Sequence, residues 1–546
     1  MSSSNKGSLM RQASILAFAG IVVRAIGLLY RIPLSRIIGD LGNSYYGIAF
    51  NIYSMLLLLS GYSIPVAVSK ITSGYLAQQQ HRNAHKVFQV SMLFITVFGG
   101  LLALLLYAFA PLILPEDGAP AVYALRALAP TLFISGFIGV LQGYFQSRNN
   151  TLPTATAQIL EQVVNAVTSI FFAFVLTRAV IDDRVETASL GALGGTLGTL
   201  CGVITAGAVL YFIYKLNQPY FQRQMRRDRT RIDVSHRTIF RQVFYLLLPV
   251  VLSTFIYNVV GILDQYIYYG IMSRKGWDAI QIGVDYGIYV GKVIPVANVP
   301  SALAYSVSVA ALPLISAAYA RKNKRELHYR INEGVNFAML IAFPAAVGMF
   351  VLAGPIMNLL FSGTPPIGRG LLMIVSVNIV TMSYSTVLSG ALQGIGKPKL
   401  ALYAGIIAIG VNVVIIIPLL ALTNLGVYGI VAAIIPHALV MGYISYRFLR
   451  RYTGFRQRFM RPVILPLIAS SLMGLMTFAV YHIAKFIFRF NFPALLIAVA
   501  SGIVIYLVLI LKMNIVNLKD VRTLPGGRYF LRLLKRVYPA VLPKHE

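Results

Sequence analysis

Long apolar runs follow one another along almost the whole chain, and they constrain its fold more than any other feature. A bilayer core about 30 Å thick needs about 20 apolar residues per helix, and only helices or closed barrels satisfy every backbone group in lipid. The runs are longer than the roughly ten-residue alternating segments of a barrel. We therefore predict an all-α polytopic membrane protein with about fourteen transmembrane helices, at residues 12–38, 45–76, 86–111, 121–147, 154–178, 189–215, 238–272, 283–320, 331–353, 367–395, 398–421, 425–450, 462–485 and 493–512.

Composition supports a membrane protein and excludes several other classes. Charged residues make up only 12% of the chain, whereas soluble domains contain about 25%. The net charge of +31 would suit a nucleic-acid-binding protein, but most basic residues lie in short loops between apolar runs, so we exclude that class. The single cysteine, Cys201, permits no disulfide within the chain. The sequence contains no Walker A motif, nucleophile elbow or acidic metal cluster, which indicates a transporter without a metal or other cofactor and not an enzyme.

The distribution of basic residues predicts how the chain is oriented. Of the 47 lysines and arginines, 35 fall on one set of alternating loops and tails and eight on the other set. The positive-inside rule therefore predicts a multi-pass protein of the cell membrane with both termini in the cytoplasm. The loop from Lys215 to Arg241 is the most basic. It could gather anionic lipid headgroups, or it could serve as a topology anchor and a linker between two halves.

Four short motifs recur in the same order in the two halves of the chain. In-order repeats of this kind are common in transporters. They predict two pseudo-symmetric six-helix lobes, residues 1–222 and 223–455, followed by two extra helices and a basic cytoplasmic tail, residues 456–546. Because each lobe has an even number of helices, the lobes should be related by an axis along the membrane normal. The matching segments are residues 27–29 with 261–263, 46–48 with 286–288, 67–75 with 311–319, and 139–143 with 390–394.

Basic residues inside the predicted helices mark a candidate substrate site. Arg24 and Arg31 are seven residues apart and so lie on nearly the same helix face. Lys292 and Arg126 lie in two other predicted helices. Charges at membrane depth usually face a cavity, and guanidinium groups bind phosphate oxygens in pairs, so these four residues predict a central pocket for a phosphate or pyrophosphate. Alternatively, Arg31 and Arg126 extend to an interface, and Arg24 pairs with an acidic group.

Two acidic residues at predicted membrane depth are candidates for ion coupling. Asp264 could bind Na⁺ or carry a proton, with Asn258, Asn378 and Asn412 as neighbouring oxygen ligands. Glu161 could act in the same way. Alternatively, each carboxylate compensates one intramembrane basic residue, and for Glu161 we favour this second interpretation.

Prolines near Lys292 are candidate hinge residues. Pro295 and Pro300 flank Asn298 within one predicted helix. Each proline removes a backbone hydrogen bond and permits a bend. We therefore predict that this segment bends when the central cavity opens or closes.

The predicted layout of six, six and two helices resembles that of the multidrug/oligosaccharidyl-lipid/polysaccharide exporter superfamily over essentially the whole chain. The segments that carry the resemblance are residues 23–31, residues 35–39 and Leu141-Gln142-Gly143. Within the superfamily the chain is most similar to polysaccharide-biosynthesis proteins of the stage V sporulation protein B type, which are relatives of the MurJ lipid II flippases. The resemblance implies two lobes around a central cavity, alternating access and an undecaprenyl-pyrophosphate-linked sugar precursor as substrate.

The resemblance also implies roles for particular residues. Arg24 and Arg31 fall on the cavity arginines of the family, and residues 462–485 and 493–512 correspond to two helices that form a groove for the lipid tail. Related flippases carry a further arginine in the second helix, which residues 51–69 of this chain lack.

We therefore expect a flippase that moves a lipid-linked, negatively charged sugar precursor, most simply lipid II, from the inner to the outer leaflet. Its partners would be this substrate, membrane lipids and enzymes of cell-wall synthesis. The inside-negative membrane potential favours outward movement of anionic charge. The alternatives are a cation-coupled multidrug exporter, a flippase for another polysaccharide or teichoic-acid unit, and a membrane scaffold.

Overall fold

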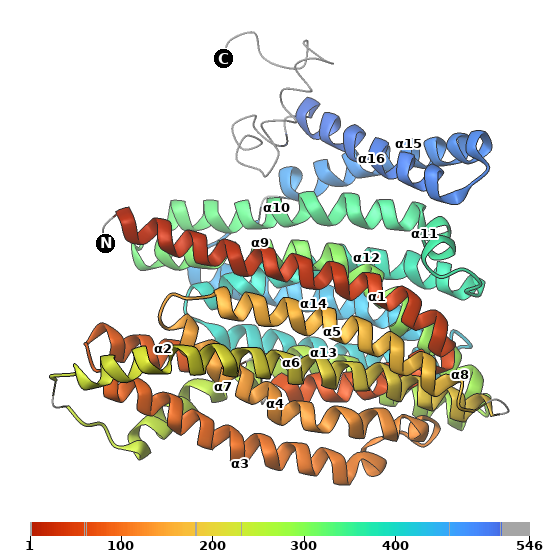
Figure 1. Cartoon of the computed structure of the whole chain (residues 1–546). Helices are drawn as coiled ribbons and strands as arrows, with labels where there is room; N and C mark the ends of the chain where they lie inside the picture. Colours follow the sequence, from red (N-terminus) through yellow and green to blue (C-terminus); the bar gives the residue numbers. More distant parts are fainter. Residues whose placement is uncertain are drawn as a thin grey trace. The chain divides into compact units, whose positions relative to one another are not determined.

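The computed structural model describes residues 3–58, 61, 63–180, 183–230, 232–457, 459–513 and 515. All regular secondary structure within these residues is helical, which confirms the predicted all-α class. Figure 1 shows the helices in chain order. Their bounds are α1 Ser3–Leu57, α2 Ile64–Ala77, α3 His81–Ile113, η2 Glu116–Ala121, α4 Val122–Gln146, α5 Leu152–Thr177, α6 Arg184–Arg226, α7 His236–Arg274, α8 Ala279–Ile288, η3 Tyr289–Val293, α9 Ile294–Ala320, α10 Lys324–Val351, α11 Ala353–Leu360, α12 Pro366–Gly394, α13 Pro398–Leu422, α14 Val427–Thr453, η4 Met460–Ile464, α15 Leu465–Phe488 and α16 Asn491–Lys512.

Ten helical segments within the described residues are long and apolar enough to cross a membrane. They comprise α3 to α6, α10 and α12 to α16, with η2 and η4 extending α4 and α15. The predicted number of fourteen spanning helices is therefore not confirmed. The other predicted ranges coincide with parts of α1, α2, α7, α8 and α9.

The backbone of α1 breaks at Gly39, which has φ +70° and ψ −180°. Glycine adopts this conformation at little cost because it has no Cβ. The predicted division between the first two helices therefore occurs at a single residue. The structure assigns residues 45–57 to α1 and residues 64–76 to α2, and residues 59, 60 and 62 between them lie outside the described residues, so one continuous helix over residues 45–76 stays a prediction. The predicted helix over residues 283–320 is interrupted by the π-helical segment η3.

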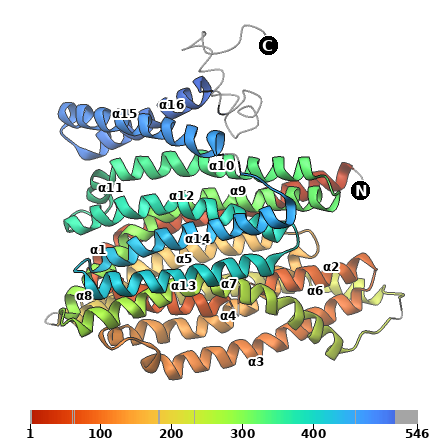
Figure 2. The same ribbon diagram turned by 180° about the vertical axis from the view of Figure 1, so that it is seen from behind.

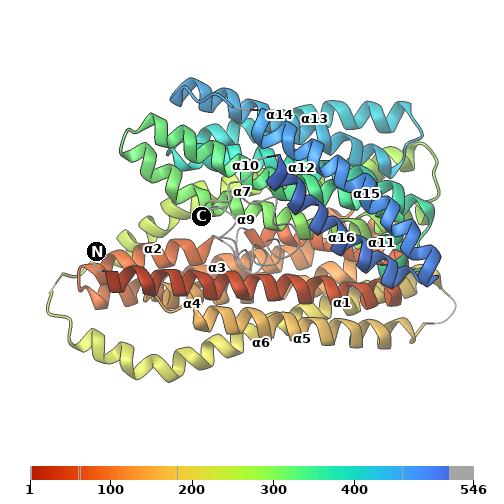
Figure 3. The same ribbon diagram turned by 90° about the horizontal axis from the view of Figure 1, so that it is seen from above.

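The chain forms two compact units, and the first comprises the residues up to Pro295 together with Ile416–Ile430. In this unit α5 and α6 lie side by side (Figure 3). Small residues permit their close approach: a Cβ at Gly202 would lie 2.6 Å from the carbonyl oxygen of Glu161, and small residues commonly form such interfaces between membrane helices. At the start of α6, the Asp183 side chain accepts hydrogen bonds from the amides of Val185 and Glu186 and so caps the helix.

The second unit comprises Val296–Ile415 and the described residues from Val431 onward. Among its described residues, a buried cluster joins α9, α10, α12 and the end of α14. The helices α15 and α16 run beside each other, as Figures 1 and 2 both show. The two units do not follow the predicted lobe boundaries, since α7 and α8 belong to the first unit. The division into lobes at residues 222 and 455 stays a prediction.

Candidate functional site

Arg31 is held by an aromatic ring from the same helix. Its guanidinium lies 4.2 Å from the centroid of the Tyr46 ring. Tyr46 is buried and lies beyond the break at Gly39, so the break brings the second part of α1 against the first. The Nε atom of Arg31 is buried and has no hydrogen-bond partner among the described residues. A cation–π contact of this kind orients the guanidinium and leaves its charge uncompensated.

Arg24 lies two turns before Arg31 on α1 and is exposed. In the described part of the chain, neither arginine forms an ion pair with a carboxylate. Between them, a Cβ at Gly27 would lie 3.4 Å from Nε2 of Gln162, so a polar part of α5 faces this stretch of α1. The sequence analysis missed Gln162, because an uncharged residue within an apolar run gives no signal on its own.

Lys292 forms an ion pair. Its Nζ lies 2.6 Å from Oδ1 of Asp40, and the two side chains are only 9% and 19% exposed. Lys292 belongs to the π-helical segment η3, and Asp40 directly follows the break at Gly39. The sequence analysis missed Asp40, since it placed this residue in a loop between two helices. The only available signal was an acidic residue directly after a glycine at the end of a long apolar run.

The face of α8 and η3 that carries Lys292 lies directly on the backbone of α1. Gly283, Gly287 and Gly291 are spaced four residues apart and so share one face. A Cβ at Gly287 would overlap the carbonyl oxygen of Asp40, and one at Gly291 would lie 2.5 Å from Asn43. The absence of side chains at these glycines therefore permits the ion pair to form.

Hydrogen bonds fix the same contact from α1. Asn43 Nδ2 donates to the carbonyl oxygen of Gly39 at 2.8 Å and to Oγ of Ser35 at 2.7 Å, across the break in the helix. Closer to the end of α1, Asn51 Nδ2 donates to Oε1 of Gln265 at 3.0 Å and to the hydroxyl of Tyr286 at 3.1 Å. These bonds tie α1 to α7 and α8 within the first unit.

The predicted ion-coupling residues fall in different parts of the molecule. Asp264 is buried on α7 in the first unit. Asn378 and Asn412 lie in the second unit. The side chain of the third predicted neighbour, at position 258, lies outside the described residues. A cation site that combines Asp264 with these amides stays a prediction.

Glu161 lies on α5, half-buried, one residue before Gln162. Within the described residues it forms no ion pair with an arginine or lysine, so compensation of a basic residue by Glu161 is not observed. Instead, Asp40 compensates Lys292. The role predicted for Glu161 therefore stays open to test.

Arg126 lies near the start of α4, and its contacts are with α3. Its Nε donates to the carbonyl oxygen of Tyr107 at 3.3 Å, and the guanidinium lies 5.2 Å from the centroid of the same ring. No described contact joins Arg126 to Arg24 or Arg31. This geometry matches the alternative in which the side chain extends toward an interface.

The two predicted hinge prolines follow the π-helical segment. Pro295 is the second residue of α9, and Pro300 lies inside the same helix. The boundary between the two compact units falls directly after Pro295. A proline and a π-helical turn both weaken the local hydrogen-bond ladder. This position is therefore consistent with the predicted hinge, which stays a prediction.

Comparison with known proteins gives one consistent set of matches. A family model described as lipid II flippase MurJ matches residues 76–498. A lipid II flippase MurJ of Bacillus subtilis (strain 168) is 24% identical over 545 residues, which covers 95% of this chain and 98% of the relative. Stage V sporulation protein B of the same organism is also 24% identical, and the match covers 96% of this chain and all of the relative.

Solved structures show the same fold. The match to a lipid II flippase MurJ in an inward closed conformation covers 90% of this chain and 97% of that protein's chain, with a TM-score of 0.63 and 16% sequence identity. An inward-facing multidrug resistance MATE family transporter of the MOP superfamily covers 82% of this chain and 98% of its own, with a TM-score of 0.64 and 17% identity. These two likenesses confirm the polytopic helical architecture expected from the sequence.

Proposed function

Because this chain belongs to the lipid II flippase MurJ family, we propose that it moves lipid II, an undecaprenyl-pyrophosphate-linked cell-wall sugar precursor, across the membrane. Members of this family are transporters and not enzymes. The substrate would be bound from the inner leaflet and released to the outer leaflet by alternating access. A flippase for another polysaccharide or teichoic-acid unit is the alternative, because a stage V sporulation protein B matches the chain as well as a MurJ does.

The observation that carries the proposal is the uncompensated charge on α1. Arg31 is oriented by the Tyr46 ring, and Arg24 lies on nearly the same face of the helix. Neither has a carboxylate partner in the part of the chain that the structure describes. Guanidinium groups bind phosphate oxygens in a bidentate manner. A pyrophosphate supplies the anionic oxygens that this pair lacks.

Lys292 has a different role in this proposal, because Asp40 already balances its charge. The ammonium would bind the substrate only after this ion pair opens. Separation of the pair would accompany a bend after η3, where Pro295 and Pro300 follow. Binding of the pyrophosphate by Lys292 would then be linked to the conformational change, because the substrate offers the ammonium a second anionic partner.

The direction of transport follows from the orientation. We propose that both termini lie in the cytoplasm, as the positive-inside rule indicates. The inside-negative membrane potential would then favour outward movement of the anionic headgroup. Coupling to Na⁺ or H⁺ through Asp264 and interaction with cell-wall synthesis enzymes are further proposals, and both can be tested separately from the substrate.

The test is a measurement of lipid II on the outer face of cells depleted of their own flippase. Cells that express this protein should expose lipid II to a membrane-impermeant labelling reagent. The double variant Arg24→Ala/Arg31→Ala should expose at least tenfold less at equal membrane abundance. The control is Arg178→Ala, since Arg178 is an exposed arginine at the end of α5 that stacks on Phe174 and is not part of α1. Accumulation of another lipid-linked intermediate without any change in lipid II would contradict the substrate assignment.

A further inference from the structure

The last part of α6 extends well beyond a membrane-spanning length. The helix has 43 residues, about 64 Å at roughly 1.5 Å per residue, whereas a bilayer core is about 30 Å thick. Figures 1 and 3 show α6 continuing beyond α5 toward the segment that leads to α7. The extension is packed: the centroid of the Phe221 ring lies 5.2 Å from that of Tyr144 and 4.6 Å from the Arg148 guanidinium. It is therefore fixed on α4.

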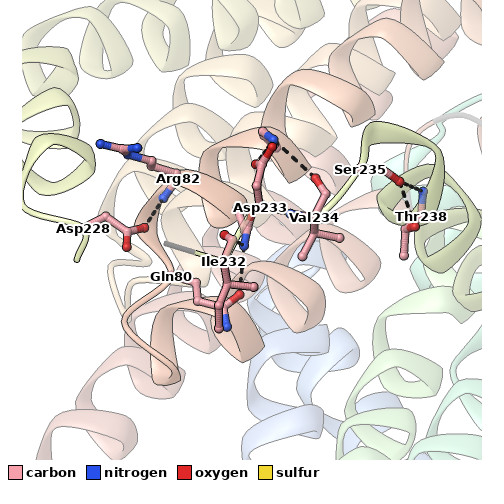
Figure 4. Close-up of polar contacts among 10 residues, drawn as sticks. Gln80, Arg82, Asp228, Ile232, Asp233, Val234, Ser235 and Thr238 are labelled. Atoms are coloured by element: carbon pink, nitrogen blue, oxygen red, sulfur yellow. Dashed lines mark hydrogen bonds and ion pairs between the residues drawn. The ribbon is translucent and has the colours of Figure 1, made fainter. Parts of the chain in front are cut away.

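The described part of the segment between α6 and α7, residues 227–230 and 232–235, is also fixed. The backbone amide of Arg82 donates to Oδ2 of Asp228 at 2.8 Å, and the Asn83 side chain donates to the carbonyl oxygen of Ile232 at 2.9 Å (Figure 4). Lys86 forms an ion pair with Asp233. These contacts place the linker on the first two turns of α3, so it is a folded part of the first unit and not only a tether.

The described contacts of the linker use its acidic groups, and Arg227 and Arg229 take part in no described ion pair. Asp228 also accepts hydrogen bonds from Thr230. Partial burial alone would raise the pKa of Asp228, but the hydrogen bonds from Arg82 and Thr230 hold it below its ordinary value. The carboxylate is therefore ionised and occupied.

A cavity of about 650 Å³ lies where the linker meets α3, and no acidic residue lines it. Small-molecule sites typically have about 300–1,000 Å³. At this cavity, Nδ1 of His81 is buried without a hydrogen-bond partner among the described residues. A cavity with two guanidinium groups and an imidazole favours an anion with several oxygens. The lining residues are Gln79, His81, Gln224, Arg227, Arg229 and Thr230.

The neighbouring surface indicates the source of this anion. Along α6 the side chains of Tyr211, Phe212, Leu216 and Tyr220 are exposed, Tyr220 to 57%. A large apolar and tyrosine-rich surface is typical of residues that contact lipid at the edge of a bilayer. Arg227 follows Tyr220 by about two turns, so the exposed apolar surface of α6 leads toward the arginines and favours a lipid as the source of the anion.

We propose that the linker between α6 and α7, together with the start of α3, forms a binding site for the phosphate-bearing headgroup of an anionic phospholipid, with Arg227 and Arg229 as the main ligands. His81 supplies a third donor from α3. The site lies on the surface of the first unit and is distinct from the α1 arginines. It does not depend on the identity of the transported substrate.

The test is a titration of the purified full-length protein in detergent with phosphatidylglycerol, and with phosphatidylcholine for comparison, read out by native mass spectrometry. The pocket variant is Arg227→Gln/Arg229→Gln. The matched control is Arg223→Gln/Arg226→Gln, which removes the same charge from exposed positions of α6 that do not line the cavity. The pocket variant should bind phosphatidylglycerol at least tenfold more weakly, and the control should stay within twofold of the wild type.

Two results would overturn the proposal. If both double variants lose the same affinity for phosphatidylglycerol, the lipid is attracted by the general positive charge of this region and does not bind in the cavity. If neither loses affinity, the lipid binds elsewhere. A titration with inorganic phosphate in lipid-free detergent identifies the source of the anion. If phosphate binds the wild type about as tightly as phosphatidylglycerol does, and only the pocket variant loses this binding, the ligand is free phosphate and not a phospholipid. Circular dichroism and gel filtration check that each variant is folded.

Discussion

At the residue scale, the described basic side chains near α1 occupy two different electrostatic states. The Arg31 guanidinium lies on the Tyr46 ring without a carboxylate partner, whereas Lys292 is paired with Asp40. An unpaired charge in a partly buried place is costly unless a ligand or water solvates it. In the proposed mechanism, Arg31 would therefore be available to bind the substrate, whereas Lys292 would hold the protein in one conformation.

Removal of Asp40 tests the ion pair. The variant Asp40→Ala leaves Lys292 buried without its partner, and loss of one member of a buried pair costs roughly 3–5 kcal/mol. The double variant Asp40→Ala/Lys292→Met should recover most of this loss, because no uncompensated charge is left. Thermal unfolding in detergent measures both. If the loss of stability in the double variant equals the sum of the losses in Asp40→Ala and in Lys292→Met, the two side chains do not interact.

The sequence could predict that Arg24 and Arg31 share one face of a helix, because their spacing is a local property of that helix. It could not identify the partner of Lys292. Asp40 is distant along the chain, and the contact depends on how η3 packs on the break at Gly39. It also could not show that Arg126 contacts Tyr107, because that contact depends on the packing of α4 on α3.

At the element scale, the glycine face of α8 and η3 determines how closely these segments approach α1. In the variant Gly287→Ala, the new Cβ would overlap the carbonyl oxygen of Asp40. Overpacking of this kind costs roughly 1–3 kcal/mol or more, and transport should fall with it. The control is Gly270→Ala on α7, where a Cβ would meet no atom within 4 Å. That control should be neutral or slightly stabilising, as thermal unfolding would show. Equal melting temperatures for Gly287→Ala and Gly270→Ala would contradict the close packing of Gly287 on the backbone of α1.

The docking of the linker on α3 should depend on pH. A hydrogen bond from Lys86 holds the pKa of Asp233 below its ordinary value, which is about 3.9 in unfolded peptides. Because the pKa is lower in the folded state, the contact stabilises docking fully above that value and is lost as the pH falls through the lowered pKa. The variant Asp233→Asn should reproduce the loss at neutral pH. Hydrogen exchange of residues 228–234, corrected for intrinsic rates, should be faster in the variant. Unchanged exchange would show that the ion pair contributes nothing.

The elements themselves were largely predictable, and their interruptions were not. Apolar runs of membrane length gave the helices because lipid enforces helical hydrogen bonding. The π-helical segment η3 has no hydropathy signature, since the residues on both sides of it are apolar. Such interruptions depend on packing and on the backbone of neighbouring helices.

At the scale of the whole molecule, the predicted orientation can be tested by cysteine labelling, because only one native cysteine, Cys201, has to be removed first. In a Cys201→Ser background, a cysteine introduced in place of Arg226 should react with an impermeant maleimide only after the cells are permeabilised. A cysteine introduced in place of Arg184, at the other end of α6, should react in intact cells. This result follows from the positive-inside rule. The reverse pattern would overturn the orientation and with it the proposed direction of transport.

The family, the helical fold and the α1 arginines lead to one central claim: the guanidinium groups of Arg24 and Arg31 bind the pyrophosphate of the lipid-linked substrate. The most direct measurement is the affinity of the purified protein for lipid II, compared between the wild type, Arg24→Ala/Arg31→Ala and the Arg178→Ala control. Hydrogen bonds to charged groups contribute about 1.5–3 kcal/mol each, so the double variant should bind at least tenfold more weakly while the control is unchanged. Equal affinity of all three proteins for lipid II would contradict the claim.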